Sequence, residues 1–347
     1  MKFKRRALPI VVLCLLNACI LSFFYITVVL SWTPSMKDSD MSPQGRNWMN
    51  RRDFTSAANI LGFSGLVTPF VVPSNIPPAQ ASSLSLAQKL SLREPSALTN
   101  SVFNIPPSTQ VYPPFMRGAW NVTLQYSGYI FPSQKIPRSR LTTNAQVPGF
   151  QKCSIATLSD VGKEVVHFTL NIDEPKGIED RSTSLTTSIN DHLGYPAVQE
   201  VLYNPKSNAN RLSVVFQEYK TTNAERIELF CNGRESELIP PPPPQPTQET
   251  DESNATPKSP KGNIFVCSEY IRQVTFSGSS QVGVPRQVGT NYAHFWTWKE
   301  VPGSNNEVMT GNLLTACYLD PQDAMFFEEP SKPVAVFSHL IKAEKFG

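Results

Sequence analysis

The sequence predicts a mainly β protein, an antiparallel barrel or sandwich of about eight to nine strands. Apolar residues alternate with polar ones along nine short segments, which is the pattern of half-buried strands. Turn-like linkers separate these segments at the spacing of all-β folds. Only Ser182–His192 and a short turn over Gln322–Phe327 have a helical pattern between them, so we expect one or two short helices in this region.

The expected strands run through most of the second two thirds of the chain. In the first of them Trp120, Val122 and Leu124 alternate with polar residues, and the later ones repeat this pattern. The nine segments are 120–126, 166–172, 198–203, 212–216, 227–231, 265–275, 290–299, 308–319 and 333–341. Because they share one character, we assign them to a single domain, residues 111–343.

Two segments lie outside this pattern. Residues 82–110 are rich in Ser and Pro and form an N-terminal arm with one short helix expected over Leu84–Leu92. Residues 239–262 combine a polyproline run with a polar, acidic tract that has almost nothing to bury. We therefore expect a disordered insertion between two strands, and a proline-rich docking site is the less favoured interpretation.

The net charge of +3 does not indicate a nucleic-acid partner. Residues 1–81 hold eight Lys and Arg against three Asp and Glu, which leaves 23 against 25 in the remainder. The basic excess therefore belongs to the N-terminal leader. No basic stripe with interleaved aromatic residues follows, so we expect no nucleic-acid binding.

The first part of the leader is residues 1–31. Four Lys and Arg in residues 2–6 precede an uninterrupted apolar run over Ala7–Ser31. Such a run serves as the core of a cleaved signal peptide, although it is long for one. It also has the length of a membrane-spanning helix, so a permanent single-pass anchor at residues 7–31 stays open as the alternative.

The next two parts favour import into a plastid. Residues 32–50 are hydroxylated and poor in acids, as in transit peptides. Arg51 and Arg52, with Phe54 two positions later, resemble a twin-arginine motif. An apolar run follows and ends in Ala79-Gln80-Ala81, a cleavage pattern of small residues. The order of these signals predicts that residues 51–81 direct the protein into the thylakoid lumen through the plastid and thylakoid translocation machinery.

Gly118-Ala119-Trp120 opens the first expected strand with a G-x-W pattern, and several later stretches add to it. Together they resemble an uncharacterised lipocalin-like domain family of cyanobacteria and plastid-bearing eukaryotes, because G-x-W opens the first strand of lipocalin-like barrels. The resemblance implies a lipocalin-like barrel and a plastid location, and it implies no activity. It also implies that Trp120 closes one end of the barrel, with Arg272 as a candidate to pack over its ring. The matching stretches are Tyr112–Thr123, Glu179–Arg181, Asn204–Lys206, Asn210–Arg211, Ser268–Gln273, Tyr318–Asp323 and Pro333–Phe337.

One expected strand carries a row of ring side chains on a single face. Tyr292, His294, Trp296 and Trp298 recur every second residue. Such a row lines a cavity for a small apolar ligand, or it forms an ordinary barrel core, which is the favoured interpretation. The four histidines have no metal-ligand spacing, and neither a phosphate loop nor a G-x-S-x-G turn is present. We therefore assign no catalytic residue, no metal and no cofactor.

Four cysteines remain once the leader is set aside. An even number in a compartment that can be oxidising allows disulfides among Cys153, Cys231, Cys267 and Cys317. Cys231 and Cys267 flank the proline-rich insertion on strands expected to be neighbours, so they are the first candidates for a pair. Buried thiols are the alternative.

Three functions fit these features. The first is a lumenal module that binds a small apolar molecule such as a lipid or a pigment. The second is a non-catalytic assembly or structural partner of thylakoid complexes, with a filled interior. The third is a lumenal enzyme built on a lipocalin-like barrel. The size of the interior cavity separates the first two, because a filled interior favours the partner.

The leader pattern makes one direct prediction. Processing after Ala81 leaves a mature protein that begins at Ser82, because the A-x-A pattern is where the last leader segment ends. N-terminal sequencing of the protein purified from its own cells checks this. A mature terminus upstream of Arg51 would contradict delivery to the lumen.

Overall fold

The computed structural model describes the arm and the β region, and all of its described residues belong to one compact unit, residues 47–347. The described residues are 84–100, 107–149, 161, 163–218, 224–241, 262–277, 286–304 and 307–346. Five features expected from the sequence lie wholly or mostly outside them. These are the leader segments 1–31, 32–50 and 51–81, residues 242–261 of the insertion expected over 239–262, and Cys153.

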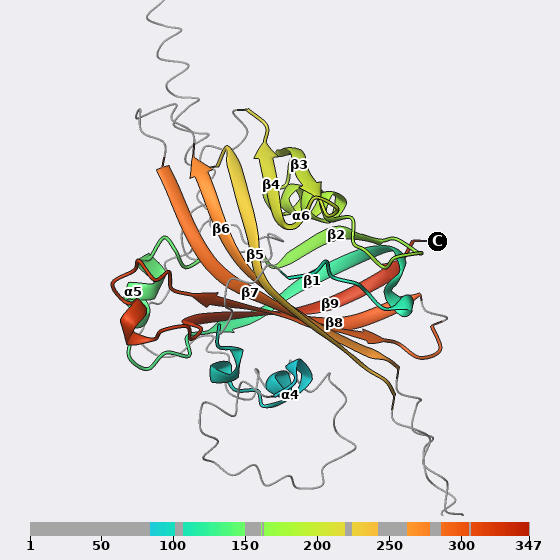
Figure 1. Ribbon diagram of the computed structural model, residues 1–347, viewed down its shortest axis with the longest axis horizontal. Helices are drawn as coiled ribbons and strands as arrows, with labels where there is room; N and C mark the ends of the chain where they lie inside the picture. Colours follow the sequence, from blue (N-terminus) through green and yellow to red (C-terminus); the bar gives the residue numbers. More distant parts are fainter. Residues whose placement is uncertain are drawn as a thin grey trace, which may run out of the picture. The chain divides into compact units, whose positions relative to one another are not determined.

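Nine strands form one antiparallel sheet in the order β2-β1-β9-β8-β7-β6-β5-β4-β3 (Figure 1). The nine segments expected from the alternating pattern are confirmed as strands. The strands are β1 (Gly118–Ile130), β2 (Val165–Ile172), β3 (Val198–Asn204), β4 (Asn208–Phe216), β5 (Arg226–Ile239), β6 (Ile264–Ser277), β7 (Arg286–Glu300), β8 (Val308–Tyr318) and β9 (Ala335–Lys345).

The alternation in the sequence places two hydrophobic clusters on opposite faces of this sheet. On β6, Ile271 belongs to the large cluster on the inner face and Tyr270 to the smaller cluster on the outer face. On β7, Tyr292 belongs to the large inner cluster and Phe295 to the smaller outer cluster. Successive side chains of a strand point to opposite faces, so this division follows directly from the sequence.

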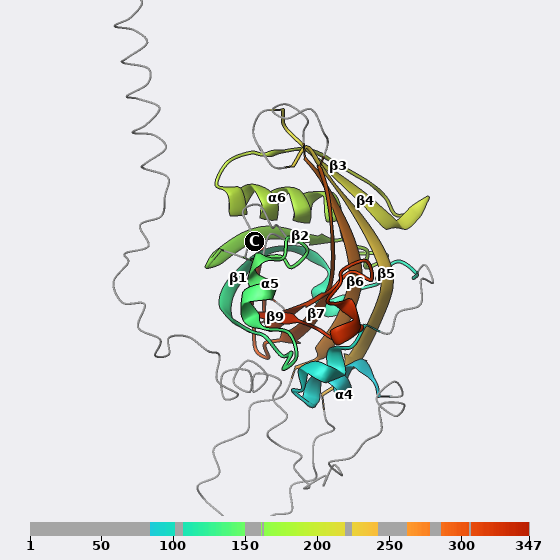
Figure 2. The same ribbon diagram turned by 90° about the vertical axis from the view of Figure 1, so that its left-hand side faces the viewer.

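The sheet curls but its strands do not close into a barrel. In the described strand pairing, β2 is bonded only to β1 and β3 only to β4, so both are edge strands. Helix α6 (Arg181–Leu193) packs against both edges and lies in the gap between them (Figure 2). The expectation of a mainly β fold is confirmed, whereas a closed barrel is not what the described strand pairing forms.

Side chains of α6 satisfy the backbone along the open edge of β2. The backbone N–H of His167 donates to Asp191 Oδ2 at 2.9 Å, and that of Thr169 donates to Thr187 Oγ1 at 3.0 Å. Asp191 and Thr187 lie four residues apart, on one face of the helix. They accept from His167 and Thr169, which lie two residues apart on β2, so that both N–H groups point to the same edge. The helix therefore bonds to this edge where a closing strand would otherwise pair.

The same helix also fixes the start of β3. Asn190 Oδ1 accepts hydrogen bonds from the backbone N–H groups of Ala197 at 2.7 Å and Val198 at 3.0 Å. The expected helix over 182–192 is thus confirmed, with one more residue at each end. Asp180 caps its first turn, and Gly194 ends it in the left-handed conformation at φ 77°.

The N-terminal arm covers the outer face of the sheet. Helix α4 (Leu86–Ser91) packs against β5 and β6 and is followed by a 3-10 turn, Pro95–Leu98. Leu86, Leu90 and Leu98 are buried in the outer hydrophobic cluster. The short helix expected in the arm is confirmed. It stabilises the fold by covering apolar surface of the sheet that water would otherwise contact.

One further helix was not expected from the sequence. Helix α5 (Arg138–Thr143) has only Leu141 fully buried, so its six residues carry no helical periodicity to detect. The expected turn near residues 322–327 is a 3-10 turn over Phe326–Glu328. No helix in the described part of the chain is long and apolar enough to cross a membrane.

Candidate functional site

The candidate site is a pocket on the inner face of the curled sheet, beside the start of α6. The pocket has a volume of about 40 Å³ and is open to solvent. Its lining combines an apolar and aromatic part with a charged part. The apolar and aromatic part is Phe168, Leu170, Leu185, His294, Trp296 and Trp298, and the polar part is Tyr112, Glu179, Arg181 and Glu269.

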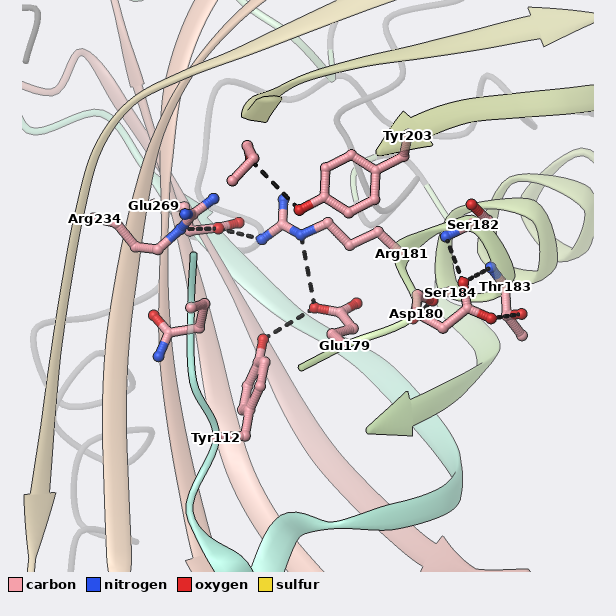
Figure 3. A network of polar contacts seen from close by, with 12 residues as sticks. Tyr112, Glu179, Asp180, Arg181, Ser182, Thr183, Ser184, Tyr203, Arg234 and Glu269 are labelled. Carbon is pink, nitrogen blue, oxygen red and sulfur yellow. Dashed lines mark hydrogen bonds and ion pairs between the residues drawn. The ribbon is translucent and has the colours of Figure 1, made fainter. Parts of the chain in front are cut away.

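Arg181 connects α6 to the far wall of the pocket. It is the first residue of the helix, and its side chain reaches across to Glu269 in the middle of β6 (Figure 3). Arg234 of β5 donates from Nε to the same Glu269 oxygen at 2.6 Å. Its Nη1 also donates to the backbone carbonyl of Ser108 at 2.5 Å. One carboxylate thus holds two guanidinium groups from different elements.

Glu179 and two tyrosines complete this network. Tyr112 donates its hydroxyl hydrogen to Glu179 Oε2 at 3.0 Å. The same oxygen lies 4.0 Å from Nε of Arg181. The guanidinium carbon of Arg181 is 5.9 Å from the ring centroid of Tyr203, within the range of cation–π contact. Segments that are far apart in the sequence therefore converge on Arg181 (Figure 3).

The protonation states of Glu269, Arg181 and Tyr112 are fixed at neutral pH. Burial disfavours the Glu269 carboxylate, but Arg181 and Arg234 outweigh it and lower its pKa to about 2. Burial also opposes the charge on Arg181, yet Glu269 and Glu179 raise the pKa of this guanidinium well above its usual value. Burial and the neighbouring Glu179 raise the pKa of the Tyr112 hydroxyl, so Tyr112 is a neutral donor.

Three of the four ring residues expected to line a cavity lie on the pocket wall. His294, Trp296 and Trp298 do so, and the two indole rings stack with centroids 5.5 Å apart and an interplanar angle of 9°. Tyr292 lies outside the lining, where it is fully buried and donates to Gln273 Oε1 at 2.9 Å. The row is therefore divided between the hydrophobic core and the pocket.

Trp120 and Arg272 do not meet. Trp120 is fully buried on the inner face and donates from its indole nitrogen to the carbonyl of Met116 at 2.7 Å. The cation near its ring is Lys345, with Nζ 5.7 Å from the centroid. Arg272 points to the outer face, because it follows the inward-facing Ile271, and its Nη2 lies 3.6 Å from Asp320 Oδ2. The expected packing of Arg272 on Trp120 is therefore wrong.

The expected disulfide between Cys231 and Cys267 is not formed. Cys231, Cys267 and Cys317 are buried and keep their thiols. Cys231 pairs in register with Ile271, four residues beyond Cys267 on β6. That offset is about 13 Å along a strand, too far for a disulfide. Burial raises the pKa of the Cys231 thiol to about 11, so this group stays protonated.

The charged half of the pocket was not identified as a site from the sequence. Tyr112, Glu179, Arg181 and Glu269 all lie within stretches that carry the family resemblance, but the resemblance gave them no role. Glu269 did carry a signal, because it is in phase with the buried residues of β6. Within the described residues, no three His, Cys, Asp or Glu side chains are grouped so that they could hold a metal ion.

A scan against protein-family models, a search of curated proteins and a search of solved structures each found no match to this chain. The resemblance to the lipocalin-like family therefore stays a prediction. Function has to be inferred from the pocket and its residues.

The ion pairs of Glu269 make stability depend on pH. Because its pKa is lower in the folded protein, Glu269 stabilises the fold above about pH 4.5, and this contribution is lost as the pH falls toward 2. Glu269→Gln should lower the free energy of unfolding by about 3–5 kcal/mol, since it leaves two buried guanidinium groups without their carboxylate. It should also flatten the pH dependence in this window. Urea unfolding between pH 2 and 7 measures both effects.

The matched control is Glu235→Gln. Glu235 is half-exposed on the outer face of β5, where its ion pair with Lys89 is 3.2 Å long. A surface pair of this kind contributes about 0–1 kcal/mol, so this variant should retain the pH dependence of the unaltered protein. Equal effects of the two substitutions would contradict the role given to Glu269.

Proposed function

We propose that the protein is a lipocalin-like binding module of the thylakoid lumen, whose interior pocket holds a small, largely apolar molecule. The observation that carries this proposal is the composition of the pocket wall. Leu170, Leu185 and the stacked Trp296 and Trp298 offer apolar and aromatic surface, and a few polar groups converge at one side. This combination is typical of sites for small organic ligands.

The shape of the sheet supports the lipocalin-like part of the proposal. Nine antiparallel strands curl around a hydrophobic interior, and α6 lies against both edge strands (Figure 2). A curled sheet of this kind presents its inward-facing side chains to one enclosed volume. The pocket draws its lining from β2, β6 and β7 and from the start of α6, so it belongs to that volume.

The size of the pocket limits what it takes. Its volume of about 40 Å³ is far below the roughly 300–1,000 Å³ of sites that enclose a drug-sized ligand. A whole pigment or a long acyl chain exceeds this space. The ligand is therefore a small molecule, or one end of a longer molecule whose remainder extends into the solvent-open part of the pocket.

The location in the thylakoid lumen is supported by the sequence of the leader. The apolar run, the transit-like segment and the twin-arginine segment occur in the order that successive translocation steps require. The near-neutral charge of the remaining chain fits a module whose function does not depend on a highly charged partner.

A second candidate function is that of a non-catalytic assembly partner for thylakoid complexes. The observation that favours it is the small volume of the pocket, about 40 Å³, because a filled interior favours an assembly partner. Met116, Trp120, Tyr292 and Leu313 are fully buried, so side chains fill the interior around them. Under this alternative the outer surface would carry the function.

Native mass spectrometry of the folded protein purified from its own cells tests the proposal. We expect an additional mass that is bound to the folded chain and is lost on denaturation. Solvent extraction of the same sample should release a small organic molecule. A native mass equal to that of the chain alone, with another protein co-purifying in a fixed ratio, would support the assembly partner and contradict the binding module.

A further inference from the structure

The two carboxylates on the pocket wall each use only one oxygen in their contacts with the protein. Glu269 Oε1 accepts from both Arg181 and Arg234. Glu179 Oε2 accepts from Tyr112 and lies near Arg181. Among the described residues, no hydrogen bond reaches Glu269 Oε2 or Glu179 Oε1. The wall thus contains two carboxylate oxygens with unused acceptor capacity.

Burial makes these oxygens important for the choice of ligand. The Glu269 side chain is only 11% exposed and that of Glu179 only 13% exposed, yet both residues line the pocket. Neither oxygen is among the fully buried side-chain atoms that lack a partner, so both are open to the pocket. An acceptor that a ligand buries without supplying a donor costs about 1–3 kcal/mol, and more when it is charged. A ligand that brings N–H donors to these oxygens avoids that cost, whereas an apolar ligand incurs it.

The cations of the network are already engaged by protein groups. Arg181 bonds to Glu269, faces Glu179 and contacts the ring of Tyr203. Arg234 is 4% exposed and lies outside the lining, where it donates to Glu269 and to a backbone carbonyl. The lining carries two carboxylates and one guanidinium, and with Arg234 bonded to Glu269 the whole cluster is neutral. The groups left open toward the pocket are therefore carboxylate acceptors, because both guanidinium groups are engaged.

The aromatic side of the pocket also favours a cationic ligand. Trp296 and Trp298 lie on the wall with Glu179 and Glu269. The faces of indole rings attract cations through their quadrupole, by about 0.5–2 kcal/mol depending on desolvation. An anion in the same space would lie beside two carboxylates.

We infer that the pocket selects a small organic cation that carries N–H donors, such as a primary ammonium group on a short apolar chain. The ammonium hydrogens bond to the unused oxygens of Glu179 and Glu269, and the apolar chain lies against Leu170 and Trp298. This inference rests on the proposed function, because it names the chemical class of the ligand that the same pocket binds.

Four probes of similar size separate the contributions of charge and of N–H donors. These are n-butylammonium, 1-butanol, butyrate and tetramethylammonium, each titrated into the folded full chain and followed by calorimetry and tryptophan emission. We expect n-butylammonium to bind at least about tenfold more tightly than 1-butanol, the scale of one charge-assisted hydrogen bond. Tetramethylammonium has the charge but no N–H group and should bind more weakly than n-butylammonium. Butyrate should bind most weakly of the four.

Glu179→Gln supplies the variant test. The amide keeps an oxygen to accept from Tyr112 but removes the negative charge, so affinity for n-butylammonium should fall about tenfold while that for 1-butanol stays unchanged. Glu235→Gln on the outer face is the matched control and should change neither affinity. If Glu179→Gln fails to fold, the order of the four probes on the unaltered chain decides the inference.

The outcomes distinguish the inference from the proposed function. Binding of 1-butanol or butyrate as tight as that of n-butylammonium overturns the cationic ligand and leaves the binding module standing. Equal binding of tetramethylammonium and n-butylammonium overturns the role of the N–H donors. If none of the four probes binds, the inference fails, and the native mass spectrum then decides the proposed function separately.

Discussion

The contact between Arg181 and Glu269 joins two parts of the molecule that strand pairing leaves apart. The sheet ends at β2 on one side and β3 on the other, and α6 occupies the gap between these edges. Arg181 extends from the first turn of that helix to the middle of β6, where Glu269 also holds Arg234 of β5. The helix is therefore bound to the inner wall of the sheet as well as to its edges, and the pocket forms where the two meet.

A buried ion pair seldom stabilises a fold more than apolar residues would in its place. Desolvation of both charges offsets most of their attraction, and well-packed apolar residues often stabilise a fold as much or more. The pair of Arg181 and Glu269 becomes understandable when stability and binding are considered together. It positions α6, and it leaves a carboxylate oxygen of Glu269 facing the pocket beside Trp296 and Trp298. The same residues would then close the fold and select the ligand.

The sequence was sufficient for the strands and for part of the site. Period-two alternation reports burial on one face, so all nine strands and the inward direction of Trp296 and Trp298 followed from it. The open edge between β2 and β3 could not be predicted, because closure depends on long-range geometry. The position of Cys231 relative to Cys267 depends on the register between β5 and β6, which alternation does not show. Glu269 could in principle have been predicted, because it is a charged residue in the same every-second-residue series as the inward-facing apolar residues of β6.

A double-mutant cycle between Arg181 and Glu269 tests the central claim most directly. Arg181→Met, Glu269→Gln and the double variant are compared with the unaltered chain by urea unfolding at neutral pH. The account predicts a coupling free energy of at least about 1.5 kcal/mol, because Glu269→Gln leaves the Arg181 guanidinium without its carboxylate, and this penalty is absent once Arg181 is replaced by Met. The loss of the carboxylate partner of Arg234 is common to both Glu269 variants and cancels in the cycle. Effects that add to within about 0.5 kcal/mol would contradict it, since the two side chains would then act independently.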